Sequence, residues 1–433
     1  MPNRPESTLT AEIAPVSKDG LKTSLLRDAI QRDASNLAGH LRQHQLNSFP
    51  PNSRKIMRRF PSAETAKLLG IAEGYLRQII AEERVVLPDN VVLTGGRRMF
   101  SVEDIVLLRD FLTSQARSRV YSPIRRAGEH TQIIGIMNFK GGSGKTTTTA
   151  HLAQYLCLRG YRVLALDLDP QASLTSLMGI QPEIEVGENE TLYGVIGGNE
   201  IHSARKVIRK TFLPNLDIVP ANLELMEFEH YAPQVLMQGS GSPLFARVSQ
   251  ALAPVLDDYD VVVVDCPPQL GFLTLSALTA ATSLLITVHP QMLDVLSMSQ
   301  FLRMVSDLLQ VVGQQQDKIF GQPQNDYDWL SYLMTRYEPS DGPQTQMQGF
   351  MRAIFGGRVL THPMLKSTAV SDAGLTSQTL YEVERQQFSR GTYDRAIDSM
   401  DMVNREIEEK ILTTWGRPIT TETKKTKGGR HVS

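Results

Sequence analysis

The sequence predicts an α/β protein in which a doubly wound, mostly parallel sheet follows a smaller, mainly helical domain. From Thr131 onward, short apolar runs alternate with helix-length segments, the rhythm of a parallel sheet covered on both faces. The runs are IIGIMNF, RVLALDLD, LDIVPA, DVVVVDCPP and SLLITVHP. The first 130 residues are basic, with 20 lysines and arginines against 14 acids, whereas the remainder has 25 against 32. The chain therefore divides into a basic N-terminal third and a larger α/β domain.

The N-terminal end is predicted to begin with a disordered segment and a long helix. Residues 1–17 are rich in proline, serine and threonine, a composition typical of disorder. Residues 18–46 follow a helical pattern, because apolar residues recur at three- to five-residue spacing: Leu21, Leu25, Ala29, Ala34, Leu37 and Leu41. This stripe serves either dimerisation or packing on its own domain, and the sequence leaves both open.

Residues 50–115 are predicted to form an α-helical winged helix-turn-helix domain. A first helix from Ser62 to Leu69 ends at Gly70, which supplies the turn, and a second helix of about 73–82 follows. The second helix is predicted to enter the DNA major groove and to present three side chains there: Tyr75, Arg77 and Gln78.

A wing is predicted after this second helix. A hairpin with Gly95 and Gly96 at its tip places Arg97 and Arg98 near DNA phosphates, and Ser101 then opens another helix. The run G-R-R-x-F-S-x-E-D resembles the winged helix of the MerR type. The basic charge of this region is compatible with nucleic-acid contact, although a solvated surface would produce it too.

The remaining boundaries follow from composition. Residues 116–130 are polar and basic and are predicted as a linker, 131–412 as the α/β domain, and 413–433 as a basic flexible tail. The N-terminus lacks an apolar signal segment, and no apolar run approaches the roughly 18 residues of a spanning helix. A cytoplasmic location without membrane contact is expected. Cys157 and Cys266 lie in apolar settings that suit buried thiols, and the histidines lack metal-ligand spacing.

The loop after the first apolar run has the form of a phosphate-binding P-loop. Residues 138–149 read NFKGGSGKTTTT and match G-x-x-x-x-G-K-[ST], except that Phe139 replaces the first glycine. Small residues let backbone N–H groups approach phosphate oxygens, and the helix that begins near Lys145 points its positive end at the same anion. Lys145 is predicted to hold the β- and γ-phosphates of ATP, and the Thr146 hydroxyl to ligate Mg²⁺. The predicted nucleotide-binding residues are Gly141, Gly142, Ser143, Gly144, Lys145, Thr146 and Thr147.

Acidic residues follow two other predicted strands. Asp167 and Asp169 end the run RVLALDLD, and Asp265 ends a run of four valines. In an open α/β sheet, ligands bind at the carboxyl ends of the strands. Asp265 has the form of a Walker B acid that holds Mg²⁺ through water.

The motifs KGGSGKTT, DLDPQAS and DCPP together resemble the deviant-Walker P-loop ATPases of the ParA/MinD class, and DPQAS points to the ParA branch. The resemblance covers residues 131–412, with the motifs in the family's order. It implies an ATP-driven homodimer in which Lys140, the family's signature lysine, neutralises charge at the nucleotide of the other protomer. It also implies that Asp169 orients the attacking water and that Asp167 supports the metal region. Lys140, Lys145 and Asp169 are thus the predicted catalytic residues.

A DNA reader fused to such an ATPase resembles the larger ParA class, and most of all the RepA group of repABC plasmid replicons. That resemblance implies plasmid partition with a ParB-like (RepB) centromere-binding partner, and autorepression through operator DNA. It further implies non-specific, salt-sensitive binding of nucleoid DNA by the ATP-bound dimer. Lys366 is the predicted contact for this, with three weaker candidates: Arg352, Arg358 and Arg390.

Two functions other than plasmid partition are compatible with parts of the sequence. The chain is alternatively a transcriptional repressor whose nucleotide site only senses ATP or ADP. The presence of Asp169 and Lys140 favours hydrolysis instead. A MinD-like membrane switch would need a C-terminal amphipathic helix, and the chain ends in TKKTKGGRHVS, which lacks an apolar face.

Overall fold

The computed structural model describes residues 26–48, 55–88, 98–116, 121–238, 243–320 and 327–418. They belong to two compact units, residues 1–54 and 55–433. In the first unit lies α1 (Leu26–Ser48), which overlaps the long helix predicted at residues 18–46 and extends two residues beyond it. Its side chains from Asp28 to His40 are exposed, apart from the half-buried Ala29. Within its own unit, the described part of the apolar stripe is therefore uncovered.

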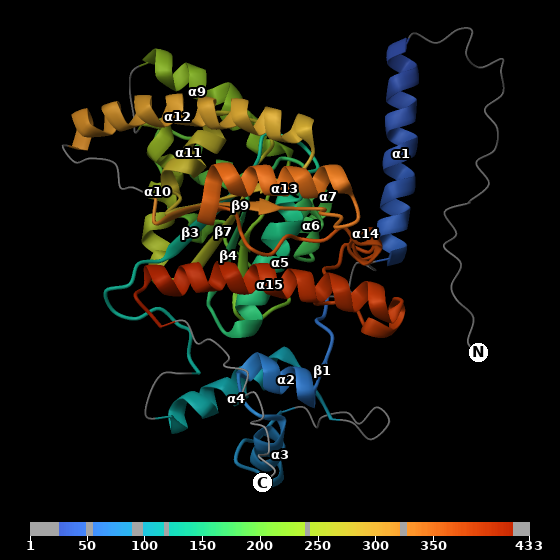
Figure 1. Ribbon diagram of the computed structural model, residues 1–433. Coiled ribbons are helices and arrows are strands. Elements are labelled where there is room, and N and C mark those ends of the chain that lie inside the picture. Colours follow the sequence, from blue (N-terminus) through green and yellow to red (C-terminus); the bar gives the residue numbers. More distant parts are fainter. Residues whose placement is uncertain are drawn as a thin grey trace, which may run out of the picture. The chain divides into compact units, whose positions relative to one another are not determined.

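The second unit is built on a seven-stranded sheet in the order β5-β6-β4-β7-β3-β8-β9 (Figure 1). Neighbouring strands run parallel, except for the antiparallel β5–β6 pair. The strands are β3 (Gln132–Met137), β4 (Val163–Asp167), β5 (Arg209–Lys210), β6 (Leu216–Val219), β7 (Val261–Asp265), β8 (Ser283–Val288) and β9 (Trp329–Met334). The prediction of a mostly parallel sheet is confirmed, and its five strands are β3, β4, β6, β7 and β8. The edge strands β5 and β9 were not predicted.

Helices cover both faces of this sheet. Alternate residues of a strand point to opposite faces, so Val261 and Val263 of β7 join one core while Val262 and Val264 join the other. The first core includes α5 (Lys145–Arg159), α6 (Ser173–Leu177), α14 (Thr368–Leu375) and α15 (Arg390–Thr414). The second includes α8 (Tyr193–Ile196), α9 (Met226–Gln238), α10 (Arg247–Leu252), α11 (Phe272–Ala280), α12 (Met292–Phe320) and α13 (Gly342–Phe355). The sheet is thus doubly covered, with α15 packed along α5 (Figure 1).

Short helices complete the connections. They are α7 (Pro182–Glu185) and the 3₁₀ turns η1 (Ala204–Lys206), η2 (Leu223–Leu225), η3 (Leu244–Ala246), η4 (Ala253–Asp258), η5 (Gly356–Arg358) and η6 (Arg385–Gln387).

Three helices and a two-stranded ladder precede the sheet. They are β1 (Phe60–Pro61), α2 (Ser62–Leu69), α3 (Glu73–Ala81), β2 (Met99–Phe100) and α4 (Val102–Gln115), with β1 antiparallel to β2. Gly70 ends α2 in the left-handed region at φ 68°, and Ser101 opens α4 with a capping box to Asp104. Both punctuation residues act as predicted. Residues 89–97, which include the predicted hairpin tip and Arg97, lie outside the described residues.

This N-terminal helical segment is fastened to the sheet domain by buried cations. Lys55 Nζ donates to the carbonyls of Leu177 at 2.5 Å and Ser377 at 2.7 Å, and pairs with Glu382 at 2.7 Å. Arg109 Nη2 donates to the carbonyl oxygens of Leu68 (2.9 Å) and Leu158 (3.0 Å). Burial lowers the pKa of Arg109 to about 10, so the guanidinium stays charged at neutral pH. The C-terminal end of α5 therefore contacts the segment directly.

The predicted linker and tail also carry contacts. Arg125 N donates to Asp260 Oδ1 at 2.9 Å, and Arg417 reaches Glu129 at 2.6 Å and the carbonyls of Pro123 and Ile124. Helix α15 continues to Thr414, beyond the predicted end of the α/β domain at 412.

Gly160→Ala is expected to weaken this attachment. Gly160 has φ 100°, and an added Cβ would lie 2.5 Å from the Arg109 Cδ, so the buried guanidinium must move. We expect a loss of at least about 1–2 kcal/mol in the free energy of unfolding by urea, from the left-handed backbone alone. Gly374→Ala is the matched control, because its Cβ meets nothing within 4 Å and its backbone is ordinary. Equal unfolding midpoints for the two variants would contradict this account.

A second prediction concerns acid stability. His151 of α5 is buried; its Nδ1 lies 2.7 Å from the Thr147 carbonyl, and its Nε2 accepts from Leu380 N at 3.1 Å. Burial lowers its pKa from 6.5 to about 4, so only the unfolded state binds the proton between these values. Stability should be fully present above pH 6.5 and should fall by up to about 3 kcal/mol as pH drops to 4.

Urea unfolding between pH 7.5 and 4 measures this loss. In His151→Asn the part due to the imidazole is absent, so the difference between the two proteins should shrink as pH falls. A pH-independent difference would show that His151 does not titrate on unfolding.

Candidate nucleotide-binding site

The P-loop joins β3 to α5 at the carboxyl edge of the sheet. Strand β3 ends at Met137 and α5 begins at Lys145, so the loop lies between a buried strand and a helix N-terminus, as predicted. Gly142 and Gly144 have φ 75° and 84°, in the left-handed region that favours glycine. A Cβ on Gly144 would lie 3.4 Å from Thr335, so glycine also permits close packing there. Gly141 is exposed.

Hydroxyl and amide side chains from neighbouring strands hold the loop in place. Thr287 at the end of β8 donates to Ser143 Oγ at 3.0 Å, and Thr335 after β9 donates to the Ser143 carbonyl at 2.7 Å. Asn138 donates to the Thr287 carbonyl and accepts from Lys140 N at 2.9 Å. These three supporting residues were not singled out from the sequence. Ser143 is therefore buried as part of the loop's framework.

Lys145 occupies the centre of the site. Its side chain is buried, and Nζ lies 3.3 Å from the Lys140 carbonyl. Burial lowers its pKa, while the carboxylates of Asp265 and Asp169 act in the opposite direction. The next two threonines, Thr146 and Thr147, are half-buried at the first turn of α5. A cation and a helix N-terminus thus converge where an anion can bind.

Two buried carboxylates lie next to each other at the carboxyl edge of the sheet. Asp167 of β4 and Asp265 of β7 are register partners, as the parallel pairing of their strands requires. Burial raises the pKa of Asp167 to about 7, and burial together with the charge of Asp167 raises the pKa of Asp265. Both groups favour the neutral form unless a positive charge is bound nearby.

The two carboxylates differ in their partners. Asp167 accepts bonds from Thr175 N at 2.8 Å, Thr175 Oγ1 at 2.7 Å and Asp169 N at 3.2 Å. Asp265 Oδ1 accepts from Thr149 Oγ1 at 3.3 Å, whereas its buried Oδ2 has no partner among the described residues. The Thr146 hydroxyl is a hydrogen-bonding neighbour of Asp265, and a carboxylate with a free oxygen beside a hydroxyl fits Mg²⁺, which prefers oxygen ligands. The donor set therefore favours Asp265 over Asp167 as the residue that could hold Mg²⁺.

Asp169 lies in the turn after β4. Its Oδ1 accepts from Gln171 N at 3.0 Å, and Ala172 follows in the left-handed region at φ 53°. This turn leaves the Asp169 side chain half-buried at the same edge as Lys145.

Lys140 lies on the exposed rim of the loop and forms an ion pair with Asp294 of α12. Asp294 is itself buried, and its other oxygen faces His289 Nδ1 at 3.5 Å. Burial lowers the pKa of His289. Asp294 lies about 150 residues after the loop, so no local pattern in the sequence connects the two. In the single chain, the predicted signature lysine, Lys140, is therefore held by an ion pair within its own protomer.

The predicted DNA contacts are placed in two regions. On α3, Tyr75 is half-buried, whereas the exposed Arg77 and Gln78 bond Glu73 and Glu82 at 2.6 and 2.8 Å. Arg98 is exposed beside β2. Lys366 lies between η5 and α14 and pairs with Glu338 at 3.0 Å. Of the weaker candidates, Arg352 donates to the Thr361 carbonyl, Arg358 lies over the Phe355 ring, and Arg390 begins α15.

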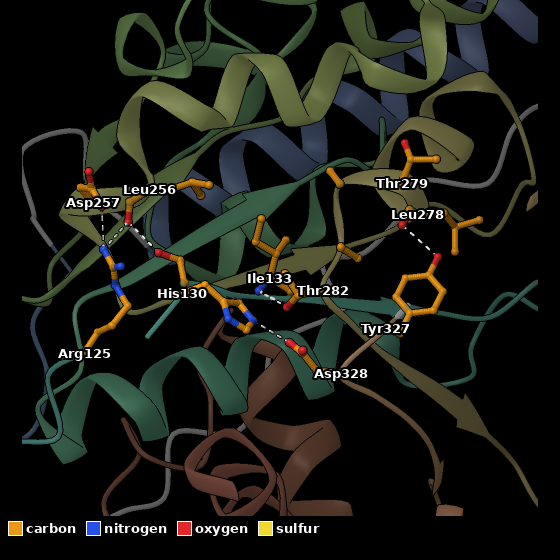
Figure 2. A pocket seen from close by; sticks show the side chains of 13 residues that line it. Arg125, His130, Ile133, Leu256, Asp257, Leu278, Thr279, Thr282, Tyr327 and Asp328 are labelled. Atoms are coloured by element: carbon orange, nitrogen blue, oxygen red, sulfur yellow. Dashed lines mark hydrogen bonds and ion pairs between the residues drawn. The ribbon is translucent and has the colours of Figure 1, made fainter. Parts of the chain in front are cut away.

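A hollow of about 790 Å³ lies at the opposite, amino edge of the sheet (Figure 2). Figure 2 shows that its polar side chains are engaged with protein partners: His130 with Asp328 at 2.7 Å, Arg125 with Asp257 at 2.9 Å, and the Tyr327 hydroxyl with the Leu278 carbonyl at 3.0 Å. Because these groups satisfy one another, the nucleotide site is the better functional candidate.

No helix in the described ranges is both long and apolar enough to cross a bilayer.

Comparison with known proteins agrees with this geometry. Residues 131–317 match a family model described as an AAA domain. A protein named "Putative replication protein A" from Rhizobium rhizogenes is 57% identical over 395 residues, covering 90% of this chain and 95% of the relative. Protein SopA of Escherichia coli (strain K12) is 29% identical over 85% of this chain and 92% of its own length. A solved structure described as a partition protein shares the fold, with a TM-score of 0.63 and 18% identity over 90% of this chain and 99% of its own. The chain therefore belongs to the ParA family of P-loop plasmid partition ATPases, alongside its replication protein A (RepA) relatives.

Proposed function

We propose that the protein is an ATP-driven partition switch that hydrolyses ATP slowly until a second protomer, DNA or a ParB-like partner completes its site. The observation that carries this proposal is the distribution of two lysines around one loop. Lys145 is buried near the carboxylates of Asp265 and Asp169, whereas Lys140 is exposed on the rim and forms an ion pair with Asp294. Lys145 binds the nucleotide of its own protomer, whereas Lys140 is placed to reach the nucleotide of a second protomer.

The loop supplies most of the binding groups. Backbone N–H groups of residues 141–147 and the Lys145 ammonium bind the phosphates of ATP, while the Thr146 hydroxyl and Asp265 hold Mg²⁺. When bound, Mg²⁺ neutralises phosphate charge and relieves the repulsion between the two buried carboxylates. Asp167 fixes the turn that carries Asp169, and Asp169 orients the attacking water. Little covalent chemistry is needed, because positioning and charge neutralisation dominate phosphoryl transfer.

Lys140 acts across a homodimer in this proposal. To reach the partner's nucleotide it must leave Asp294, and the phosphates offer a stronger negative charge than one carboxylate. Apolar side chains exposed around the same rim support association there: Phe139, Met292, Leu293 and Leu296.

The N-terminal segment provides sequence-specific binding of operator DNA and hence autorepression. Helix α3 carries its polar side chains on an exposed face, and α2, Gly70 and α3 have helix-turn-helix order. A nucleotide-sensing repressor is the second candidate function, favoured by the direct contact of Arg109 with the end of α5. In both cases the protein acts in the cytoplasm, and in the first it associates with the nucleoid.

Substitutions of Asp169 and Lys140 separate ATP binding and dimerisation from ATP hydrolysis. Asp169→Ala should reduce the ATPase rate at least about 100-fold while leaving ATP binding and ATP-dependent dimerisation intact, since it removes water positioning. Lys140→Ala should lose both the stimulated rate, by about 1,000-fold, and the dimer. Lys206→Ala, an exposed lysine of η1, is the control. ATPase assays and analytical ultracentrifugation measure these effects, and wild-type turnover in Asp169→Ala would remove its catalytic role.

Binding of arbitrary duplex DNA distinguishes the two candidate functions. With ATP–Mg²⁺ the partition switch should bind such DNA tightly, with an affinity that falls steeply with salt, and should bind weakly with ADP or without nucleotide. Lys366→Ala should reduce the salt slope by about one if that residue contacts a phosphate. Binding confined to the upstream region of its own gene, in every nucleotide state, would instead favour the repressor.

A further inference from the structure

Arg336 is a second cation beside the P-loop that no motif of the sequence singles out. It follows β9 directly, between Thr335, which bonds the Ser143 carbonyl, and Tyr337, whose N–H donates to the Met364 carbonyl at 2.9 Å. Its Nη1 lies 3.4 Å from the carbonyl oxygen of Gly142. The guanidinium is therefore attached to the rim of the same loop that carries Lys140 and Lys145.

The backbone of Arg336 adopts an unfavourable conformation. Its φ is 53°, in the left-handed backbone region that residues other than glycine rarely adopt. Both neighbours are fixed by hydrogen bonds, which hold the residue in this conformation. Strain of this kind persists where the surrounding structure enforces it, and it concentrates at ligand sites. Ala172, in the turn after Asp169, is a second such residue at this site.

The charge of Arg336 is not neutralised by a carboxylate within the described part of the chain. The guanidinium donates a long hydrogen bond to the Gly142 carbonyl, and the side chain is exposed. Lys140 differs, because Asp294 already neutralises it. His289, the nearby titratable group on this side, brings no negative charge. An arginine offers a planar fork of donors that matches phosphate oxygens.

We propose that Arg336 binds the phosphates of the nucleotide held by its own P-loop, as a further phosphate-contacting residue of this site. The inference rests on the proposed ATP site. Its guanidinium need not break an ion pair to reach the ligand, and the rigid turn between Thr335 and Tyr337 aims it at the loop. Phosphate binding also accounts for the presence of an arginine at a left-handed position, where glycine would be unstrained.

The test is nucleotide binding by the full-length protein with Mg²⁺, measured as displacement of a fluorescent ATP analogue by ATP and by tripolyphosphate. Arg336→Gln should raise the Kd of both ligands at least tenfold, and Arg336→Lys should give intermediate values because it keeps the charge without the fork. Tripolyphosphate lacks the nucleoside, so an unchanged Kd for it, with weakened ATP, would place Arg336 on the base or sugar and overturn the proposal.

Arg336→Gly separates ligand binding from folding. Glycine accepts φ 53° without strain, so the melting temperature without nucleotide should be no lower than that of the wild type, while ATP affinity falls as in Arg336→Gln. Arg205→Gln, whose arginine pairs with Asp258 and bonds the Pro254 carbonyl near the amino end of β7, is the matched control and should bind ATP normally.

The remaining outcomes distinguish failure of the Arg336 phosphate contact from failure of the proposed ATP site. A lower melting temperature in both the Gln and Gly variants, with ATP affinity restored by cooling, would make Arg336 a support of the P-loop and overturn the proposal. Wild-type ATP affinity in all three variants would overturn it too, while leaving the ATP site intact. Failure of the wild-type protein itself to bind ATP would instead refute the proposed function.

Discussion

The structure depends on one electrostatic constraint, the placement of two buried carboxylates at adjacent strand ends. The parallel pairing of β4 with β7 makes Asp167 and Asp265 register partners, so neither can move away from the other without disturbing the sheet. Burial raises the pKa of both carboxyls, the charge of Asp167 raises that of Asp265 further, and Lys145 opposes the shift at Asp265. The site is thus built to be incomplete without further positive charge, which is what a Mg²⁺-dependent phosphate site requires.

Helix α5 transmits the position of this site across the domain. Its first turn carries Lys145, its centre is buried between the sheet and α15, and its last carbonyls meet Arg109 from the N-terminal segment. A buried helix moves as a rigid body, because each of its residues is packed on several sides. Helix α5 thus forms a continuous packed connection between the phosphate end of the site and the segment that carries α3. Under either candidate function, this connection is the route by which the proposed nucleotide site would influence the proposed DNA-binding helix α3.

Much of the fold was predictable because its signals are local. Five strands are short apolar runs bounded by polar or turn residues, and Gly70 and Ser101 punctuate helices as their chemistry predicts. Strand β9, WLSYLM, was not predicted, although its composition suits an edge strand and the preceding segment GQPQNDYD is rich in turn-forming residues. The P-loop was predictable for the same local reason. Asp294, Thr287 and Arg336 reach the loop from segments about 150 to 200 residues away, so only the assembled sheet brings them together.

The contrast between Lys140 and Arg336 shows how identical formal charges acquire different roles. Lys140 is half-exposed, so its own side of the ion pair is screened by water and contributes little to stability. Asp294 is buried, and when the lysine departs, the described residues leave its carboxylate with His289 as its ionisable neighbour, at a cost of at least about 1–3 kcal/mol. Departure is therefore unfavourable until phosphate charge attracts the lysine more strongly than Asp294 does. Arg336 has no such competitor among the described residues and can bind at once. The pair of cations would thus respond in sequence, with Arg336 engaging the bound nucleotide and Lys140 released only when a second nucleotide comes within reach.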